Sequence, residues 1–141
     1  LALYVTMYSP LQMAADLPEN YEKYPDAFQF IKDVAVDWQD SKYLEAEPGD
    51  YLTVARKDKK SEKWFLGAIT DENARTTEIK LDFLSPNKKY KAIIYQDSKT
   101  ADWKNNPISY DIKTLEVNSK SKIKLNLAKG GGTAISFQPI N

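Results

Sequence analysis

The sequence contains no cysteine and no histidine among its 141 residues. This absence excludes thiol nucleophiles, zinc sites built from cysteine and histidine, and Ser-His-Asp triads. It also removes the side chain that titrates most readily near neutral pH. Carboxylate chemistry, calcium binding by oxygen ligands and recognition by aromatic rings remain open. A chain without cysteine is compatible with the cytoplasm and with the periplasm alike.

The chain also has no excess of positive or negative charge. Twenty basic and twenty acidic residues cancel, so no global field attracts nucleic acid or an anionic membrane surface, and we expect neither partner. The apolar opening LALYVTMYSPLQMAAD contains Ser9, Pro10 and Gln12. It is shorter than the about 20 apolar residues of a membrane span and lacks the basic start of a secretory signal. We therefore expect no membrane span, and we interpret the opening as the buried end of a larger fold.

The residue pattern changes near Trp38. The stretch PDAFQFIKDVAVDW, residues 25–38, has apolar side chains at helical spacing, and Pro25 suits a first helical turn. We predict a helix from Pro25 to Ala35. Before it, a helix that ends ahead of Pro10 and a short buried strand at Leu11–Ala15 would give the helix, strand and helix rhythm of a parallel α/β barrel.

Short β-strands follow in residues 38–141. The predicted strands are YLTVARK, KWFLGAIT, TEIKLDFL, YKAIIYQD, ISYDIK, KIKLNLA and TAISFQP. Turn segments such as EPGD, SPNKK, KNNP and KGGG separate them. We therefore predict a mainly β chain, in which an antiparallel β-sandwich of about seven or eight strands follows an N-terminal helical segment. In TEIKLDF and KIKLNL the alternation predicts one core face and one solvent face.

Four irregular stretches occur in order: YSPLQMAADLPENYEKYPDAFQFIKDV, YLEAEPGDYLTVARK, YQDSKTADWKNNP and KGGGTAISF. Together they resemble the C-terminal end of glycoside hydrolase family 97, a family of α-glucosidases and α-galactosidases. The resemblance implies an N-terminal β-sandwich, a catalytic (β/α)8 barrel and a C-terminal β-sandwich associated with oligomerisation. Residues 1–37 would then be the remnant of the last barrel unit, and residues 38–141 would be the C-terminal domain.

The resemblance also implies what this segment lacks. The family's catalytic glutamates and calcium ligands lie upstream of the last barrel strand, so we assign no catalytic residue, metal ligand or cofactor here and expect calcium in the parent's barrel. The implied partners are that barrel, further copies of the chain in a homo-oligomer and, for the parent, an α-linked oligosaccharide. The implied location is the periplasm. Cleavage of α-glucosides or α-galactosides, by inversion or retention, stays open.

The acidic candidates are few. Asp16 follows the predicted barrel strand and is a candidate for a substrate pocket, although aspartate at such a position more often caps a turn. The segment EAEPGD brings Glu45, Glu47 and Asp50 together, yet it lacks the ligand order of a calcium loop. We interpret it as a solvated turn.

The aromatic and apolar candidates point to contacts. Trp103 stands in the polar stretch TADWKNNP and is predicted either to contact a neighbouring domain or subunit or to pack within its loop. Trp64 is expected in the core, and Trp38 at the junction between helix and sandwich. Residues 1–16 are expected either to pack their apolar side chains, with Tyr4, Met7, Leu11 and Met13 foremost, against the sandwich or against another copy, or to be poorly ordered.

Three functions fit these observations. The first, which we favour, is an accessory segment that supports the barrel of an α-glycosidase and mediates oligomers. The second is an independent carbohydrate-binding sandwich, which requires a row of exposed aromatic rings. The third is a structural domain with no link to sugars.

Overall fold

The computed structural model describes residues 1–140, and these form three short helices and eight strands. The helices are α1 (Leu3–Thr6), α2 (Pro18–Tyr21) and α3 (Pro25–Asp33). The strands are β1 (Trp38–Glu47), β2 (Tyr51–Asp58), β3 (Trp64–Thr70), β4 (Arg75–Lys80), β5 (Lys89–Asp97), β6 (Tyr110–Asn118), β7 (Lys122–Leu127) and β8 (Gly132–Ile140). The predicted mainly β fold is thus confirmed.

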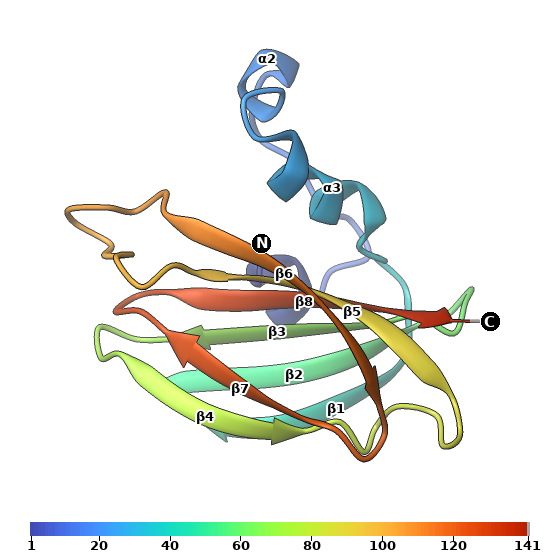
Figure 1. The fold of residues 1–141 in the computed structure, drawn as a ribbon. Helices are drawn as coiled ribbons and strands as arrows, with labels where there is room; N and C mark the ends of the chain where they lie inside the picture. The colour runs from blue at the N-terminus through green and yellow to red at the C-terminus, as the bar shows by residue number, and fades with distance from the viewer. Residues whose placement is uncertain (141) are drawn as a thin grey trace.

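The strands form two antiparallel sheets. Six of them pair in the order β1-β2-β3-β8-β5-β6, and β4 pairs with β7 in a separate two-stranded ribbon. In Figure 1 this ribbon crosses in front of the large sheet, while α2 and α3 stand beyond its other side. The large sheet is therefore the middle layer, with a β-ribbon on one face and the N-terminal helices on the other.

The first core lies between the large sheet and the ribbon. Buried side chains of β7 occur at every second residue, Ile123, Leu125 and Leu127, as the alternation in KIKLNL predicts. Trp64 is buried in this core, which confirms the sequence prediction. All the buried residues of this core lie after residue 54, so the sheet and ribbon form it without the N-terminal segment.

The second core lies on the other face of the sheet. Val5 and Phe30 of the N-terminal segment are buried there against Phe65 and Tyr95 of the sheet. The Phe30 ring lies 5.3 Å from that of Tyr95 and 6.1 Å from that of Phe65, both edge to face, which is a favourable arrangement for aromatic pairs. The ring of Trp38 is 5.8 Å from that of Phe65. Trp38 thus closes the junction between helix and sheet, as predicted.

Helix α1 approaches the sheet closely because β3 carries a glycine beneath it. A Cβ atom on Gly67 would lie 2.7 Å from the carbonyl oxygen of Ala2 and 2.9 Å from Cβ of Val5, distances that real Cβ atoms do not reach. The second core therefore depends on the missing side chain at this position.

A buried arginine holds the other end of α1. Arg56 of β2 donates from Nε to the carbonyl oxygen of Val5 at 2.7 Å and from Nη1 to Oγ of Ser41 at 2.6 Å. Its guanidinium also lies 5.7 Å from the ring of Tyr8 and 5.9 Å from that of Tyr43. A cation near a helix C-terminus interacts favourably with the partial negative charge of the free carbonyl groups there. Arg56 therefore fastens α1 to β2.

Some predicted elements differ from those observed. Leu11–Ala15 is not a strand, because no strand among residues 1–140 lies beside it to complete its hydrogen bonds. The predicted helix from Pro25 ends at Asp33 instead of Ala35, since Val34 has extended backbone angles. Strand β1 was not predicted, because its polar sequence WQDSKYLEAE has no regular alternation.

The two edges of the large sheet differ. Strand β1 has register shifts between Trp38 and Asp40 and between Tyr43 and Glu45. Strand β6 pairs with β5 without a shift along its whole length. One edge is therefore irregular and the other straight.

Candidate functional site

A hollow of about 470 Å³ lies where the start of the chain meets two loops of the sheet. Its walls come from Leu1 to Leu3, the ends of β3 and β5, the β5–β6 connection around Trp103 and the turn that leads from Ala128 into β8. Segments far apart in the chain thus enclose one space, and Trp103 is part of its wall.

The connection that carries Trp103 is held by its own hydrogen bonds. Oδ1 of Asp102 accepts from the backbone N–H groups of Lys104 at 3.0 Å and Asn105 at 2.8 Å. The Nδ2 group of Asn106 donates to the carbonyl oxygen of Thr100 at 3.1 Å. The backbone N–H groups that hold the Asp102 carboxylate, that of Asn105 first, lower its pKa. The loop is therefore organised locally, yet the Trp103 side chain stays 63% exposed.

The opposite wall is built around Asp97. Its Oδ2 accepts hydrogen bonds from the backbone N–H groups of Ala128 at 2.9 Å and Gly132 at 3.0 Å. A side chain at Gly131 would overlap this carboxylate, and Gly130 has a φ of +63°. The KGGG segment is thus a tight turn, but it connects β7 of the ribbon to β8 of the large sheet, so the hairpin that the sequence suggested is not formed. Burial raises the pKa of Asp97, and the two backbone N–H groups oppose that rise.

The predicted interface residues of the opening segment separate into two kinds. Tyr4 packs against the second core, and its hydroxyl donates to the carbonyl oxygen of Met13 at 3.1 Å. The side chains of Met7, Leu11 and Met13 are exposed. Exposed large apolar residues close together in the sequence are typical of a surface that contacts another body, so the interface prediction for these residues stands as a prediction.

Asp16 lies beside a second hollow, of about 520 Å³, that α2 and α3 help to line. Its Oδ1 accepts from Nδ2 of Asn20 at 2.6 Å and from the backbone N–H of Leu17 at 2.7 Å. These bonds, that of Asn20 first, lower the pKa of Asp16. The carboxylate thus braces the turn before α2 through Leu17 and Asn20, although no side chain caps the helix itself; a role in a substrate pocket stays a prediction.

The acidic residues of EAEPGD make hydrogen bonds and an ion pair within the β1–β2 turn and with β4. Glu45 accepts from Oγ1 of Thr77 at 2.6 Å and pairs with Arg75 at 3.3 Å, which links β1 to β4. The backbone N–H of Asp50 donates to the carbonyl oxygen of Glu47 at 3.0 Å. Among residues 1–140, no group of three acidic side chains is placed to hold a metal ion.

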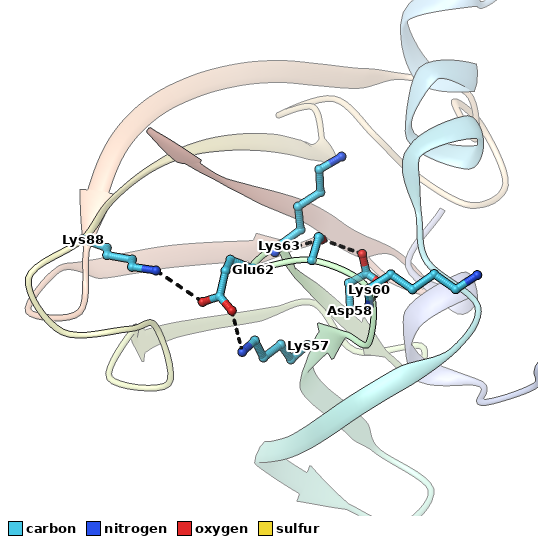
Figure 2. A network of polar contacts seen from close by, with 7 residues as sticks. Lys57, Asp58, Lys60, Glu62, Lys63 and Lys88 are labelled. Atoms are coloured by element: carbon cyan, nitrogen blue, oxygen red, sulfur yellow. Dashed lines mark hydrogen bonds and ion pairs between the residues drawn. The ribbon is translucent and has the colours of Figure 1, made fainter. Parts of the chain in front are cut away.

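A lysine-rich polar network, which sequence reasoning did not single out, surrounds the β2–β3 turn. Figure 2 shows Glu62 between Lys57, at 3.2 Å, and Lys88, at 3.5 Å. Asp58 accepts from the backbone N–H of Lys60 at 3.1 Å. Since Glu62 and Lys88 are about half exposed, we interpret this network as support for the turn.

This architecture is that of a mainly β domain with N-terminal helices attached to one face of its large sheet. No helix within residues 1–140 is long and apolar enough to span a membrane. The family model described as "Glycosyl-hydrolase 97 C-terminal, oligomerisation" matches residues 37–138. The chain belongs to this family.

Relatives of the chain are much longer than the chain itself. It is 34% identical over 138 residues to a retaining alpha-galactosidase of Bacteroides thetaiotaomicron, covering 98% of this chain and 20% of that protein. It is 52% identical to a family 97 enzyme of Pseudoalteromonas sp. strain K8, solved with panose and with acarbose, at a TM-score of 0.97 over 99% of this chain and 22% of that one. A beta-arabinopyranosidase that is 22% identical shares the fold, with a TM-score of 0.76. The match covers 96% of this chain and 20% of that protein. The chain thus spans about a fifth of the length of these relatives.

Proposed function

We propose that this chain is the non-catalytic C-terminal part of a family 97 hydrolase of α-linked oligosaccharides. In this proposal residues 1–37 end the catalytic barrel, and residues 38–141 form a β-domain that braces it. The second core carries the proposal, because Val5 and Phe30 come from the first segment while Phe65 and Tyr95 come from the second. Two segments that share one buried core hold each other in place.

The proposed substrate of the parent is an α-glucoside. The relative with 52% identity was solved with panose and with acarbose, whereas the α-galactosidase relative is 34% identical. The α-galactoside remains the second choice. Rates of the full-length enzyme on nitrophenyl α-glucoside and nitrophenyl α-galactoside decide between them.

The catalytic carboxylates and a calcium ion are proposed to lie in the remaining part of the parent, which we propose to be periplasmic. We expect the 141-residue chain alone to hydrolyse neither nitrophenyl substrate, with or without calcium. Turnover by this chain that disappears in Asp16→Asn would contradict the proposal and would place Asp16 in a working site.

The bracing role is tested by Phe30→Ala in the full-length enzyme. Deleting a buried phenylalanine costs about 3 to 5 kcal/mol of stability, and here the loss would fall on the contact between barrel and β-domain. Phe28→Ala is the matched control, because the Phe28 ring stacks on Tyr21 at 4.6 Å outside the second core. We expect Phe30→Ala to lower the temperature of inactivation far more than the control does. Equal effects of the two changes would refute the bracing role.

The family description also supports a role in assembly, and we propose that the parent is a homo-oligomer. A second candidate function, carbohydrate binding by the β-domain, is favoured by one observation: the exposed indole of Trp103 beside a hollow. Titration of the full-length protein, its catalytic site blocked by acarbose, with maltooligosaccharides would reveal such binding.

A further inference from the structure

We propose that the hollow beside Trp103 binds a short α-linked gluco-oligosaccharide, one ring of which stacks on the exposed indole. The polar side chains that line the hollow all come from the β-domain. This assignment rests on the proposed function, because the class of sugar is that of the proposed substrate of the parent.

The indole of Trp103 is available to a ligand. It is 63% exposed, in a loop that Asp102 and Asn106 hold with their own hydrogen bonds. A Cβ atom added to Gly130 would lie 3.6 Å from Cβ and 3.8 Å from Cγ of Trp103. Since residue 130 has no side chain, the turn leaves this side of the indole uncovered. An aromatic ring presented by an ordered loop offers a large apolar face to the C–H surface of a sugar at a low entropic cost.

Four side chains that line the hollow have hydrogen-bonding atoms to spare. Oδ2 of Asp97 accepts from two backbone N–H groups, but its Oδ1 has no partner among residues 1–140. Asn106 donates from Nδ2 to the carbonyl oxygen of Thr100, and its Oδ1 is likewise without a partner in that range. The side chains of Gln96 and Lys129 make no hydrogen bond or ion pair within the same residues.

These spare atoms are of both kinds that a sugar needs. A sugar hydroxyl donates one hydrogen bond and accepts others, as a serine hydroxyl does. The amide of Gln96 and the ammonium of Lys129 supply donors, while the carboxylate of Asp97 and Oδ1 of Asn106 supply acceptors. A few polar groups beside an aromatic face are typical of a small-ligand site.

Two protein hydroxyls that also line the hollow have their hydrogens occupied. Oγ1 of Thr70 donates to the carbonyl oxygen of Asn73 at 3.0 Å, and the hydroxyl of Tyr110 donates to Asp26 at 2.8 Å. Both oxygens can therefore only accept from a ligand, and the ligand must bring its own donors. Sugar hydroxyls meet this requirement.

The charges and the size of the hollow argue against other ligands. One ammonium, that of Lys129, stands against the two carboxylates of Asp97 and Asp102, so a phosphate or another anion is disfavoured. The volume of about 470 Å³ falls within the range of about 300 to 1,000 Å³ that small-molecule sites occupy. A neutral ligand of the size of a short sugar fits both limits.

The experiment titrates maltotriose into the full-length enzyme while acarbose, at the concentration that stops hydrolysis, is present. Hydrogen exchange is followed in residues 98–109 and 128–132, and we expect it to slow with a saturable dependence on maltotriose. Trp103→Ala should weaken this binding about tenfold, the change expected on loss of an aromatic hot spot. Trp103→Phe, which keeps a ring face, should weaken it less. Ile108→Ala should leave it unchanged, because Ile108 lies in the same connection, is 67% exposed and is outside the hollow.

The other outcomes overturn the assignment. Exchange that maltotriose does not slow, or slows equally in wild type and Trp103→Ala, shows that the indole binds no sugar. Slowing by melibiose, whose non-reducing ring is an α-galactoside, but not by maltotriose contradicts the class of sugar. A changed oligomer mass in Trp103→Ala without any sugar assigns the hollow to a contact between copies. The proposed function fails separately, when Phe30→Ala behaves like its own control.

Discussion

The hydroxyl of Tyr110 donates a hydrogen bond of 2.8 Å to Oδ1 of Asp26 and so joins the edge strand β6 to α3. Burial, together with this bond, raises the pKa of Tyr110 to about 12. The same bond is the main cause that lowers the pKa of Asp26. The pair therefore favours the protonated tyrosine and the ionised aspartate, and it fastens the helical layer to the outer strand of the sheet.

This pair predicts a dependence of stability on pH. Because the pKa of Tyr110 is raised on folding, its contribution is complete below pH about 10, the ordinary value, and is lost as pH rises toward about 12. The lowered pKa of Asp26 gives a contribution that is lost on acidification. Since the pair is exposed to solvent, we expect less than about 1 kcal/mol.

The check is denaturant unfolding of wild type and Tyr110→Phe between pH 7 and 11. The difference between the two proteins should shrink as pH rises. Tyr24→Phe is the control, since the Tyr24 ring lies 6.5 Å from that of Tyr110. A constant difference across this range would show that the hydrogen bond contributes nothing.

Gly67→Ala should displace α1 from the sheet. The added methyl group would lie 2.7 Å from the carbonyl oxygen of Ala2, and overpacking of this kind costs about 1 to 3 kcal/mol. Gly49→Ala is the comparison, because a Cβ there meets nothing within 4 Å although φ is +92°. Hydrogen exchange of residues 1–8 should accelerate in Gly67→Ala alone. Equal acceleration in both variants would mean that α1 is not held by this contact.

Arg56→Lys should weaken the attachment of α1 although it keeps the positive charge. A lysine cannot donate to both Val5 and Ser41 from the positions that the guanidinium uses. We expect a loss of about 1 to 3 kcal/mol from the unpaired buried groups. Lys42→Ala, which removes an exposed ion pair with Asp40, should cost less than about 0.5 kcal/mol. Chemical denaturation of the three proteins makes the comparison, and similar losses for both changes would contradict it.

A shortened chain that begins at Asp37 should fold but self-associate. The first core has no buried residue before Ala55, and Leu44, which packs against it, is retained, so the core survives the deletion. The second core loses Val5 and Phe30 and leaves Val54 and Phe65 uncovered. Thermal melting tests folding and light scattering tests association, and Phe65→Lys in the shortened chain should reduce the scattering. A chain that shows no cooperative melting would place the domain boundary elsewhere.

The sequence predicted most accurately the strands that have one buried face and one solvent-exposed face. The alternation of Ile123, Leu125 and Leu127 predicts β7 and its buried side correctly. The run WFLGAIT predicts β3 but cannot show that both of its faces are covered. Strand β1 was not predicted, because its buried and exposed residues do not alternate regularly. Its register shifts against β2 interrupt that alternation.

The hollow could not be predicted, since its walls come from several distant segments that only the fold brings together. One signal pointed to it: the large apolar ring of Trp103 in an otherwise polar stretch. The distance from Leu1 to this ring in the sequence conceals their closeness in the molecule. The predicted strand at Leu11–Ala15 failed for the opposite reason, because the pattern was apolar but no neighbouring strand was there to pair with it.

The two edges of the large sheet differ in how easily another strand could pair with them, which is the first step of fibril formation. The register shifts of β1 make that side a poorer template for a foreign strand. Strand β6 offers a straight template, and only its charged side chains, such as Asp111, Lys113 and Glu116, discourage such growth. Solution conditions that neutralise these charges would therefore favour edge-to-edge pairing of molecules along β6, and less so along β1.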